Sequence, residues 1–270
     1  MQKSPAPFPW KFFILSFVFT WICWSPGWLA TLGLFELPVP FLVFFFIGTW
    51  GPFAAASWLT YREEGKEGLR SFWRRGIDFS FPKVWLLVIL FVALLVSAVP
   101  LGAHLLLGGA KPEPGLLANP IMILPVFLTY FFTGGGNEEW GWRGYALDRL
   151  QSRWSPLKAS LVLGVIWGFW HLPLFFIEYT GQYHLSLLLF MLFTPAMSIL
   201  HSWVYNAAGR SLLAAWLLHA AMGAAWEVFP NVQPNVTGFE RVFVFDHTVT
   251  TVLALAVVTS TREKLGLKEE

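Results

Sequence analysis

The sequence has little charge and almost no cysteine. Only 13% of its 270 residues are charged, which is about half the share found in soluble domains. The net charge of +2 is too small to indicate a nucleic acid or another polyanion as a partner. The single cysteine, Cys23, excludes an intramolecular disulfide and a cysteine-rich metal site. Together, the low share of charged residues and the small net charge exclude an ordinary soluble domain, a disordered chain and a nucleic-acid-binding protein.

Apolar residues, in contrast, make up 56% of the chain. They form runs of the length that crosses a bilayer, about 20 residues for a helix. The runs are residues 12–28, 40–59, 84–107, 121–135, 157–177, 185–207 and 212–229, followed by a shorter run at 248–261. We therefore expect an all-α polytopic membrane protein whose residues 1–270 form a single bundle of about eight transmembrane helices.

The lysines and arginines indicate how such a bundle is oriented. If both termini are cytoplasmic, 16 of the 18 lysines and arginines fall on the cytoplasmic side, and only Lys111 and Arg241 fall outside. Cytoplasmic loops of membrane proteins carry an excess of these residues. The sequence therefore predicts cytoplasmic N and C termini.

Residues 61–83 are the one charge-dense stretch of the chain. Within it, Leu69, Phe72, Trp73 and Ile77 recur at helical spacing between charged residues. This pattern predicts a short amphipathic helix that lies on the cytoplasmic surface of the membrane. The alternative is a solvated linker between two spans.

Ionisable side chains inside a membrane are costly, so each one is a candidate for function. The candidates in or at the ends of the apolar runs are Glu138, Glu139, Arg143, His171, His201, His219, Glu227, Asp246 and His247.

The first candidates form the motif Glu138-Glu139-x-x-x-Arg143. On a helix, Glu139 and Arg143 are four residues apart and face each other, which predicts an ion pair. Glu138 is rotated by about 100° and is free to act as a base. The alternative is a surface loop at the membrane boundary, and the glycines at 134–136 weaken the prediction of an unbroken helix.

Two histidines lie deep in later runs. His171 follows Trp167 by four residues, so both lie on one face of a helix, and His219 lies in the seventh run. A glutamate with two imidazoles from three helices could position and deprotonate a water molecule. The same set could hold a catalytic zinc ion with an open fourth position. The alternative for each histidine is a hydrogen bond to a neighbouring helix.

These motifs resemble the CAAX-protease and bacteriocin-processing family, which includes the type II CAAX prenyl endopeptidases. The resemblance rests on the two glutamates with Arg143, on Trp167-x-x-x-His171 and on His219, and it covers residues 129–225. It implies an eight-helix intramembrane endopeptidase with its catalytic core in residues 120–229. A prokaryotic cell membrane, membrane lipids and an unidentified peptide or protein substrate are the expected location and partners.

By position, the resemblance implies that Glu138 activates the attacking water, His171 helps to position it and His219 stabilises the oxyanion. Glu139 and Arg143 would hold this geometry through their ion pair. Members of the family have been described both as metalloproteases and as metal-free glutamic proteases. If zinc is bound, Glu138, His171 and His219 are its expected ligands. Neither histidine has an evident carboxylate partner in the sequence, which favours the metal-free mechanism.

One position departs from the family pattern. The last family motif is usually His-x-x-x-Asn, or has a similar small polar residue in its last position, whereas here the residue four positions after His219 is Gly223. The loss of one oxyanion donor can reduce the rate by about 10²–10³. His201, a backbone N–H or a water molecule could replace the donor, although His201 could equally be a helix-contact residue.

Gly223 is also compatible with a different class of function. On the same scaffold, the chain could be a catalytically weak or inactive membrane adaptor or immunity protein. Buried Glu and His could instead relay protons in a transporter. The sequence shows no internal repeat of the kind that many transporters contain, which argues against a transporter.

Overall fold

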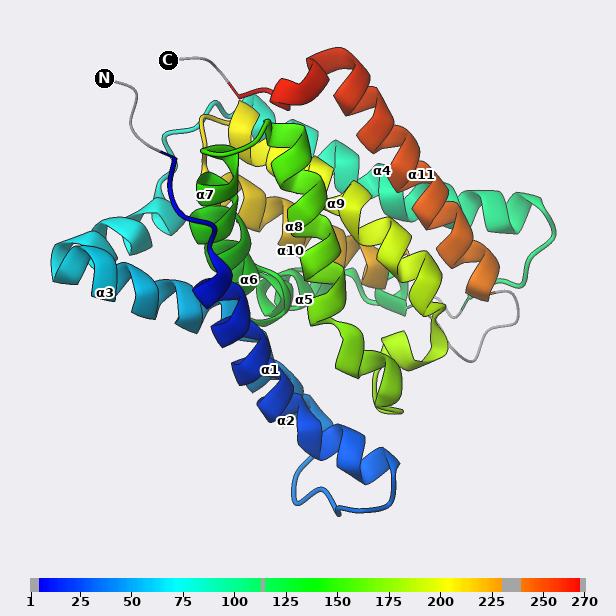
Figure 1. The fold of residues 1–270 in the computed structure, drawn as a ribbon. Coiled ribbons are helices and arrows are strands. Elements are labelled where there is room, and N and C mark those ends of the chain that lie inside the picture. The colour runs from blue at the N-terminus through cyan, green and yellow to red at the C-terminus, as the bar shows by residue number, and fades with distance from the viewer. Residues whose placement is uncertain (1–4, 113–114, 230–238, 268–270) are drawn as a thin grey trace.

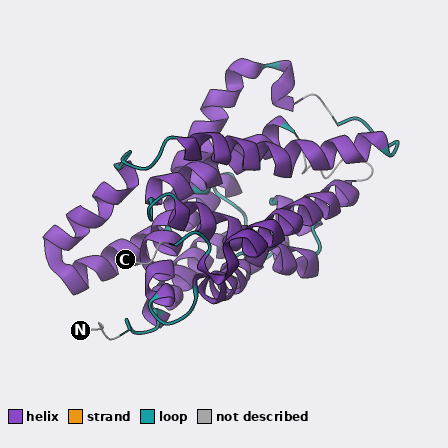
Figure 2. Cartoon of the chain, turned by 90° about the horizontal axis from the view of Figure 1, so that it is seen from above, coloured by secondary structure: helices purple, strands orange, loops and turns teal. Residues whose placement is uncertain are grey.

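The computed structural model describes residues 5–112, 115–229 and 239–267. These residues form helices, turns and loops, with no strand among them (Figure 2). The long helices are α1 (Trp10–Thr31), α3 (Gly51–Arg74), α4 (Val84–Leu106), α8 (Pro156–Trp170), α9 (Leu187–Ala207), α10 (Leu212–Val228) and α11 (Phe239–Thr261). Shorter helices are α2 (Phe41–Thr49), α5 (Ile123–Thr129), α6 (Gly136–Gly141) and α7 (Asp148–Gln151) (Figure 1).

The protein is an all-α polytopic membrane bundle. Six helical segments among the described residues are long and apolar enough to cross a bilayer. They are Trp10–Thr31, Phe41–Ile77, Val84–Leu106, Pro156–Phe176, Leu187–Ala207 and Glu240–Lys264. Of the two other expected spans, the seventh corresponds to α10, which is apolar but shorter.

The fourth expected span, residues 121–135, is not one continuous helix. It contains α5, a π-helical turn at Tyr130–Gly134 and a break at Gly135 before α6 begins. A second π-helical turn, Trp142–Leu147, follows α6. Irregular backbone within a membrane is tolerated where protein surrounds it. The broken segment therefore fits a position inside the bundle, where the predicted site residues Glu138 and Glu139 also lie.

The charged stretch after residue 60 is helical as far as Arg74, because it continues α3. The helix is kinked at Gly65, whose φ of 69° only glycine adopts readily. Phe72 is buried and its ring lies 5.3 Å from that of Trp140 in α6, whereas Ile77 is exposed. The apolar side of this helix therefore packs against the segment that carries the site.

The two ends of the described chain lie at the same end of the bundle (Figure 1). The Ala6 backbone N–H donates to Ser152 Oγ after α7, and Gly266 lies against Ala207 at the end of α9. An even number of crossings requires this arrangement. The side of the membrane on which this end lies remains a prediction.

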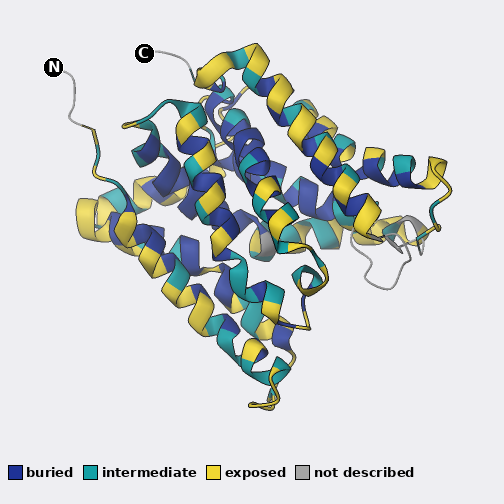
Figure 3. Ribbon diagram, turned by 45° about the vertical axis from the view of Figure 1, so that its right-hand side comes forward, coloured by how far each residue is buried: buried dark blue, intermediate teal, exposed yellow. Residues whose placement is uncertain are grey.

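Burial follows the helix faces (Figure 3). The inner faces of α8, α9 and α10 are buried, whereas leucines such as Leu87 and Leu188 point outward and are each 69% exposed. Exposed leucine is expected on a surface that lipid covers. α8 and α9 pack closely at Gly164, where a Cβ would collide with Pro195. This contact holds together two of the helices that carry candidate residues.

Candidate active site

Glycine allows α6 to lie directly against α10. A Cβ at Gly136 would overlap the Trp216 indole and the Phe131 carbonyl oxygen, and one at Gly135 would collide with the His219 ring. Trp216 Nε1 donates to that carbonyl at 2.5 Å and fixes the contact. The glycines that weakened the helix prediction thus bring the glutamate motif to the histidine on α10.

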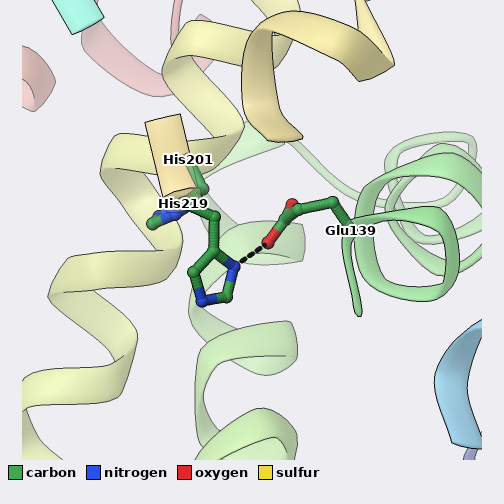
Figure 4. A group of neighbouring side chains, drawn as sticks. All are labelled: Glu139, His201 and His219. Atoms are coloured by element: carbon green, nitrogen blue, oxygen red, sulfur yellow. Dashed lines mark hydrogen bonds and ion pairs between the residues drawn. The ribbon is translucent and has the colours of Figure 1, made fainter. Parts of the chain in front are cut away.

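Glu139 is the centre of a buried ionic network, of which Figure 4 shows the bond to His219. Its Oε1 accepts from Arg143 Nη1 at 2.9 Å, and both side chains are fully buried. The same oxygen accepts from His219 Nδ1 at 2.8 Å. Arg143 Nη2 also donates to Ser198 Oγ on α9 at 3.4 Å. The ion pair that the spacing predicted is present, and it is tied to two further helices.

The bond between Glu139 and His219 corrects one step of the sequence interpretation. A metal-free mechanism was favoured because neither histidine had an evident carboxylate partner. That premise is wrong for His219, whose Nδ1 lies against a carboxylate. The two residues are 80 positions apart, so no local pattern indicates the contact.

Glu138 faces a different environment from its neighbour. Its Oε2 accepts from Trp167 Nε1 at 2.9 Å and from Trp142 Nε1 at 3.2 Å, and the residue is 4% exposed. No arginine is paired with it in the described structure. Trp142 was not among the predicted site residues, although its spacing of four from Glu138 could have indicated the contact.

Trp167 lies between the candidate histidines. Its ring centre is 5.6 Å from the rings of His171 and His219 and 5.9 Å from that of His201. Its carbonyl oxygen accepts from His171 Nδ1 at 2.8 Å. A carbonyl can only accept, so Nδ1 carries the proton and His171 Nε2 has a free lone pair. Trp167 thus orients both Glu138 and His171.

His201 is fully buried on α9, and its ring centre lies 5.1 Å from that of His219. One ligand atom each from Glu139, His201 and His219 lies within 4.8 Å of the others. Within the described residues, these are the three side chains that could share a metal ion. This set differs from Glu138, His171 and His219, which the sequence analysis gave as the expected ligands of a zinc ion.

Gly223 lies one turn beyond His219, and Tyr130 fills the space beside it. A Cβ at Gly223 would overlap the Tyr130 ring. The Tyr130 hydroxyl donates to Glu227 Oε1 at 2.8 Å. An asparagine at this position would require the tyrosine to move. Tyr130 was not among the predicted residues, since no sequence pattern links it to Gly223.

The remaining ionisable candidates lie elsewhere. His247 on α11 stacks on Phe193 and contacts Phe243, with ring centres 4.3 Å and 4.0 Å away. Asp246 Oδ1 accepts from Thr250 Oγ1 at 3.3 Å. Neither residue contacts the glutamate motif in the described structure, so the site is confined to the broken segment and α8 to α10.

The chain is similar to known endopeptidases. Residues 120–225 match the model of a family described as type II CAAX prenyl endopeptidase Rce1-like. A protein named CAAX prenyl protease 2 from Methanococcus maripaludis is 27% identical over 244 residues, which cover 83% of this chain and 86% of that protein. The matched region contains every candidate residue from Glu138 to His219.

Proposed function

We propose that this chain is an intramembrane endopeptidase of the CAAX-protease and bacteriocin-processing family, a proposal that its similarity to type II CAAX prenyl endopeptidases supports. We further propose that it cleaves its substrate with a water molecule activated by Glu138. The observation that carries this role is the contrast between two adjacent glutamates. Arg143 neutralises Glu139, whereas Glu138 is held by indole N–H groups alone. Glu138 is therefore the carboxylate that is left to accept a proton.

The contacts of Glu138 suit a general base. Trp142 and Trp167 both bind Oε2, so they orient the carboxylate while Oε1 is left for water. Proton transfer by such a positioned base contributes about 10²–10⁴ to the rate. His171 Nε2, whose lone pair is free, can accept a second hydrogen bond from the same water and align its oxygen with the carbonyl.

His219 fits the role of the oxyanion donor. Its Nδ1 lies 2.8 Å from Glu139 Oε1, and this bond fixes the orientation of the ring. With a proton on Nε2, the ring can donate from that nitrogen to the oxygen that becomes negative as water attacks. Glu139 and Arg143 act by holding His219 and the backbone of α6 in place.

We also propose the environment in which this reaction takes place. The substrate is a protein or peptide attached to the membrane, because the site lies in a membrane bundle and the relative in Methanococcus maripaludis is named as a CAAX prenyl protease. The expected location is the plasma membrane of a prokaryote, with lipids around the apolar faces of the bundle.

Glu138→Gln tests this mechanism. Glutamine keeps an oxygen for the two indoles but accepts no proton, so cleavage should fall at least about 100-fold. Wild type and variant would be purified in detergent, with Glu240→Gln on α11 as the matched control, and incubated with a quenched peptide library and a membrane proteome. The control should cleave as wild type does.

Two results would contradict the proposed mechanism. Equal cleavage by Glu138→Gln and wild type would exclude Glu138 as the base. Absence of cleavage by wild type across both substrate sets would favour the inactive adaptor or immunity protein. That second function is favoured by one observation, the glycine at position 223 where the family usually has asparagine.

A further inference from the structure

Three side chains from three helices lie close together inside the bundle (Figure 4). Glu139 comes from α6, His201 from α9 and His219 from α10. One ligand atom of each lies within 4.8 Å of the others. Glu139 and His201 are fully buried, and the His219 side chain is 12% exposed.

Two acceptor atoms in this cluster have no partner among the described residues: Glu139 Oε2 and His201 Nε2. His201 Nδ1 lies 2.9 Å from the Met197 carbonyl oxygen, which can only accept, so this nitrogen carries the ring proton. His201 Nε2 is therefore a bare lone pair. A buried acceptor without a donor is costly, and here two of them belong to one cluster. A cation would satisfy both.

We propose that Glu139, His201 and His219 form a binding site for a divalent transition metal ion, with Zn²⁺ as the best match. Two imidazole nitrogens and one carboxylate oxygen are a common set of protein ligands for zinc, with the fourth position open. Ca²⁺ and Mg²⁺ prefer oxygen ligands and fit less well. The bond from His201 Nδ1 to a backbone carbonyl is the kind that orients a metal-binding imidazole.

This site is separate from the proposed base. Glu138 Oε2 is engaged by two tryptophans, and Glu138 is not part of the cluster. Arg143 binds Glu139 Oε1, so its positive charge will oppose the metal and lower the affinity. Binding also requires that the coordinating nitrogen of His219 be unprotonated. A metal held there would withdraw His219 from its proposed oxyanion role and reduce cleavage.

Metal binding is best measured directly, on full-length protein purified in detergent with a tag that lacks histidine. After treatment with a chelator, the protein would be titrated with ZnCl₂ and its bound zinc counted by mass spectrometry. The variant is His201→Gln. Its control is His247→Gln on α11, a buried histidine that likewise donates from Nδ1 to the carbonyl four residues earlier.

We expect wild type, His247→Gln and Glu138→Gln to bind one zinc ion per chain, and His201→Gln to bind it at least about 10-fold more weakly. Retention of zinc by Glu138→Gln separates this site from the proposed base, because that variant loses cleavage whether or not the metal site exists. Wild type that binds no zinc would overturn the site, and so would equal affinity in His201→Gln and wild type.

A second measurement needs no variant and covers the case in which His201→Gln fails to fold. Co²⁺ bound to wild type in place of zinc should give the intense visible absorption of a four-coordinate ion. The weak spectrum of hydrated cobalt, unchanged by the protein, would overturn the site.

Discussion

Two ionic networks of similar composition lie only a few residues apart and differ in burial. In one, Glu139 binds Arg143, and both side chains are fully buried. In the other, Asp148 binds Arg75 at 3.2 Å and Arg210 at 2.8 Å, with side chains that are 21%, 33% and 47% exposed in that order. Similar contacts therefore have different energetic consequences, because water can replace a lost partner only in the second network.

The two networks also differ in what they connect. The buried network joins α6 to α9 and α10 through Ser198 and His219. The exposed network joins α7 to the end of α3 and to the loop before α10, and Tyr205 Oη also donates to Asp148. The first sets the relative position of the candidate catalytic groups, whereas the second ties together the ends of helices.

Arg143→Ala should give the largest effect, because it leaves Glu139 charged and buried without its cation. Removing one partner of a buried pair costs about 3–5 kcal/mol. We expect a strongly lowered melting temperature in detergent and loss of cleavage. The double variant Glu139→Gln, Arg143→Met should recover part of the stability, since it leaves no unpaired charge. An Arg143→Ala protein that melts as wild type does would show that the pair does not stabilise the fold.

Gly223→Asn tests whether the buried region around Glu139 and His219 is as sensitive to added side-chain volume as it is to the loss of a charge. The asparagine would supply the donor that the family pattern contains, which by sequence alone predicts a gain in activity. The structure predicts a loss, because the new side chain collides with Tyr130. Overpacking of this kind costs about 1–3 kcal/mol.

The paired variant Gly223→Asn, Tyr130→Ala makes room for the asparagine and is the control. It should melt at a higher temperature than Gly223→Asn alone and recover cleavage. A single Gly223→Asn variant that is stable and more active than wild type would show that Tyr130 moves aside easily and that the missing donor limits the reaction.

Helix periodicity accounts for what the sequence predicted correctly about the site. A spacing of four placed Arg143 against Glu139 and left Glu138 apart, and it placed Trp167 and His171 on one face. Apolar runs of bilayer length likewise predicted the all-α membrane bundle.

Contacts between helices were not predictable in this way. The bond from His219 to Glu139, the approach of His201 to Glu139 and the fit of Tyr130 against Gly223 all join residues at least 60 positions apart. Each depends on how the helices pack against one another. Such packing produces no periodic pattern of residues that a single sequence could show. The prediction of a continuous fourth span was wrong for a related reason. The length of its apolar run suggested one helix, whereas its glycines allow a close contact with α10.

Arg210→Ala should have the smallest effect and completes the comparison. Asp148 keeps Arg75 and the Tyr205 hydroxyl as partners, and half-exposed pairs contribute about 0–1 kcal/mol. Salt should remove the remaining difference, since it screens exposed charges. Arg210 also has a φ of 60°, a region that favours glycine. Arg210→Gly should therefore be more stable than Arg210→Ala, as judged by melting at low and high salt. A loss as large as that of Arg143→Ala would mean that burial does not distinguish the two networks.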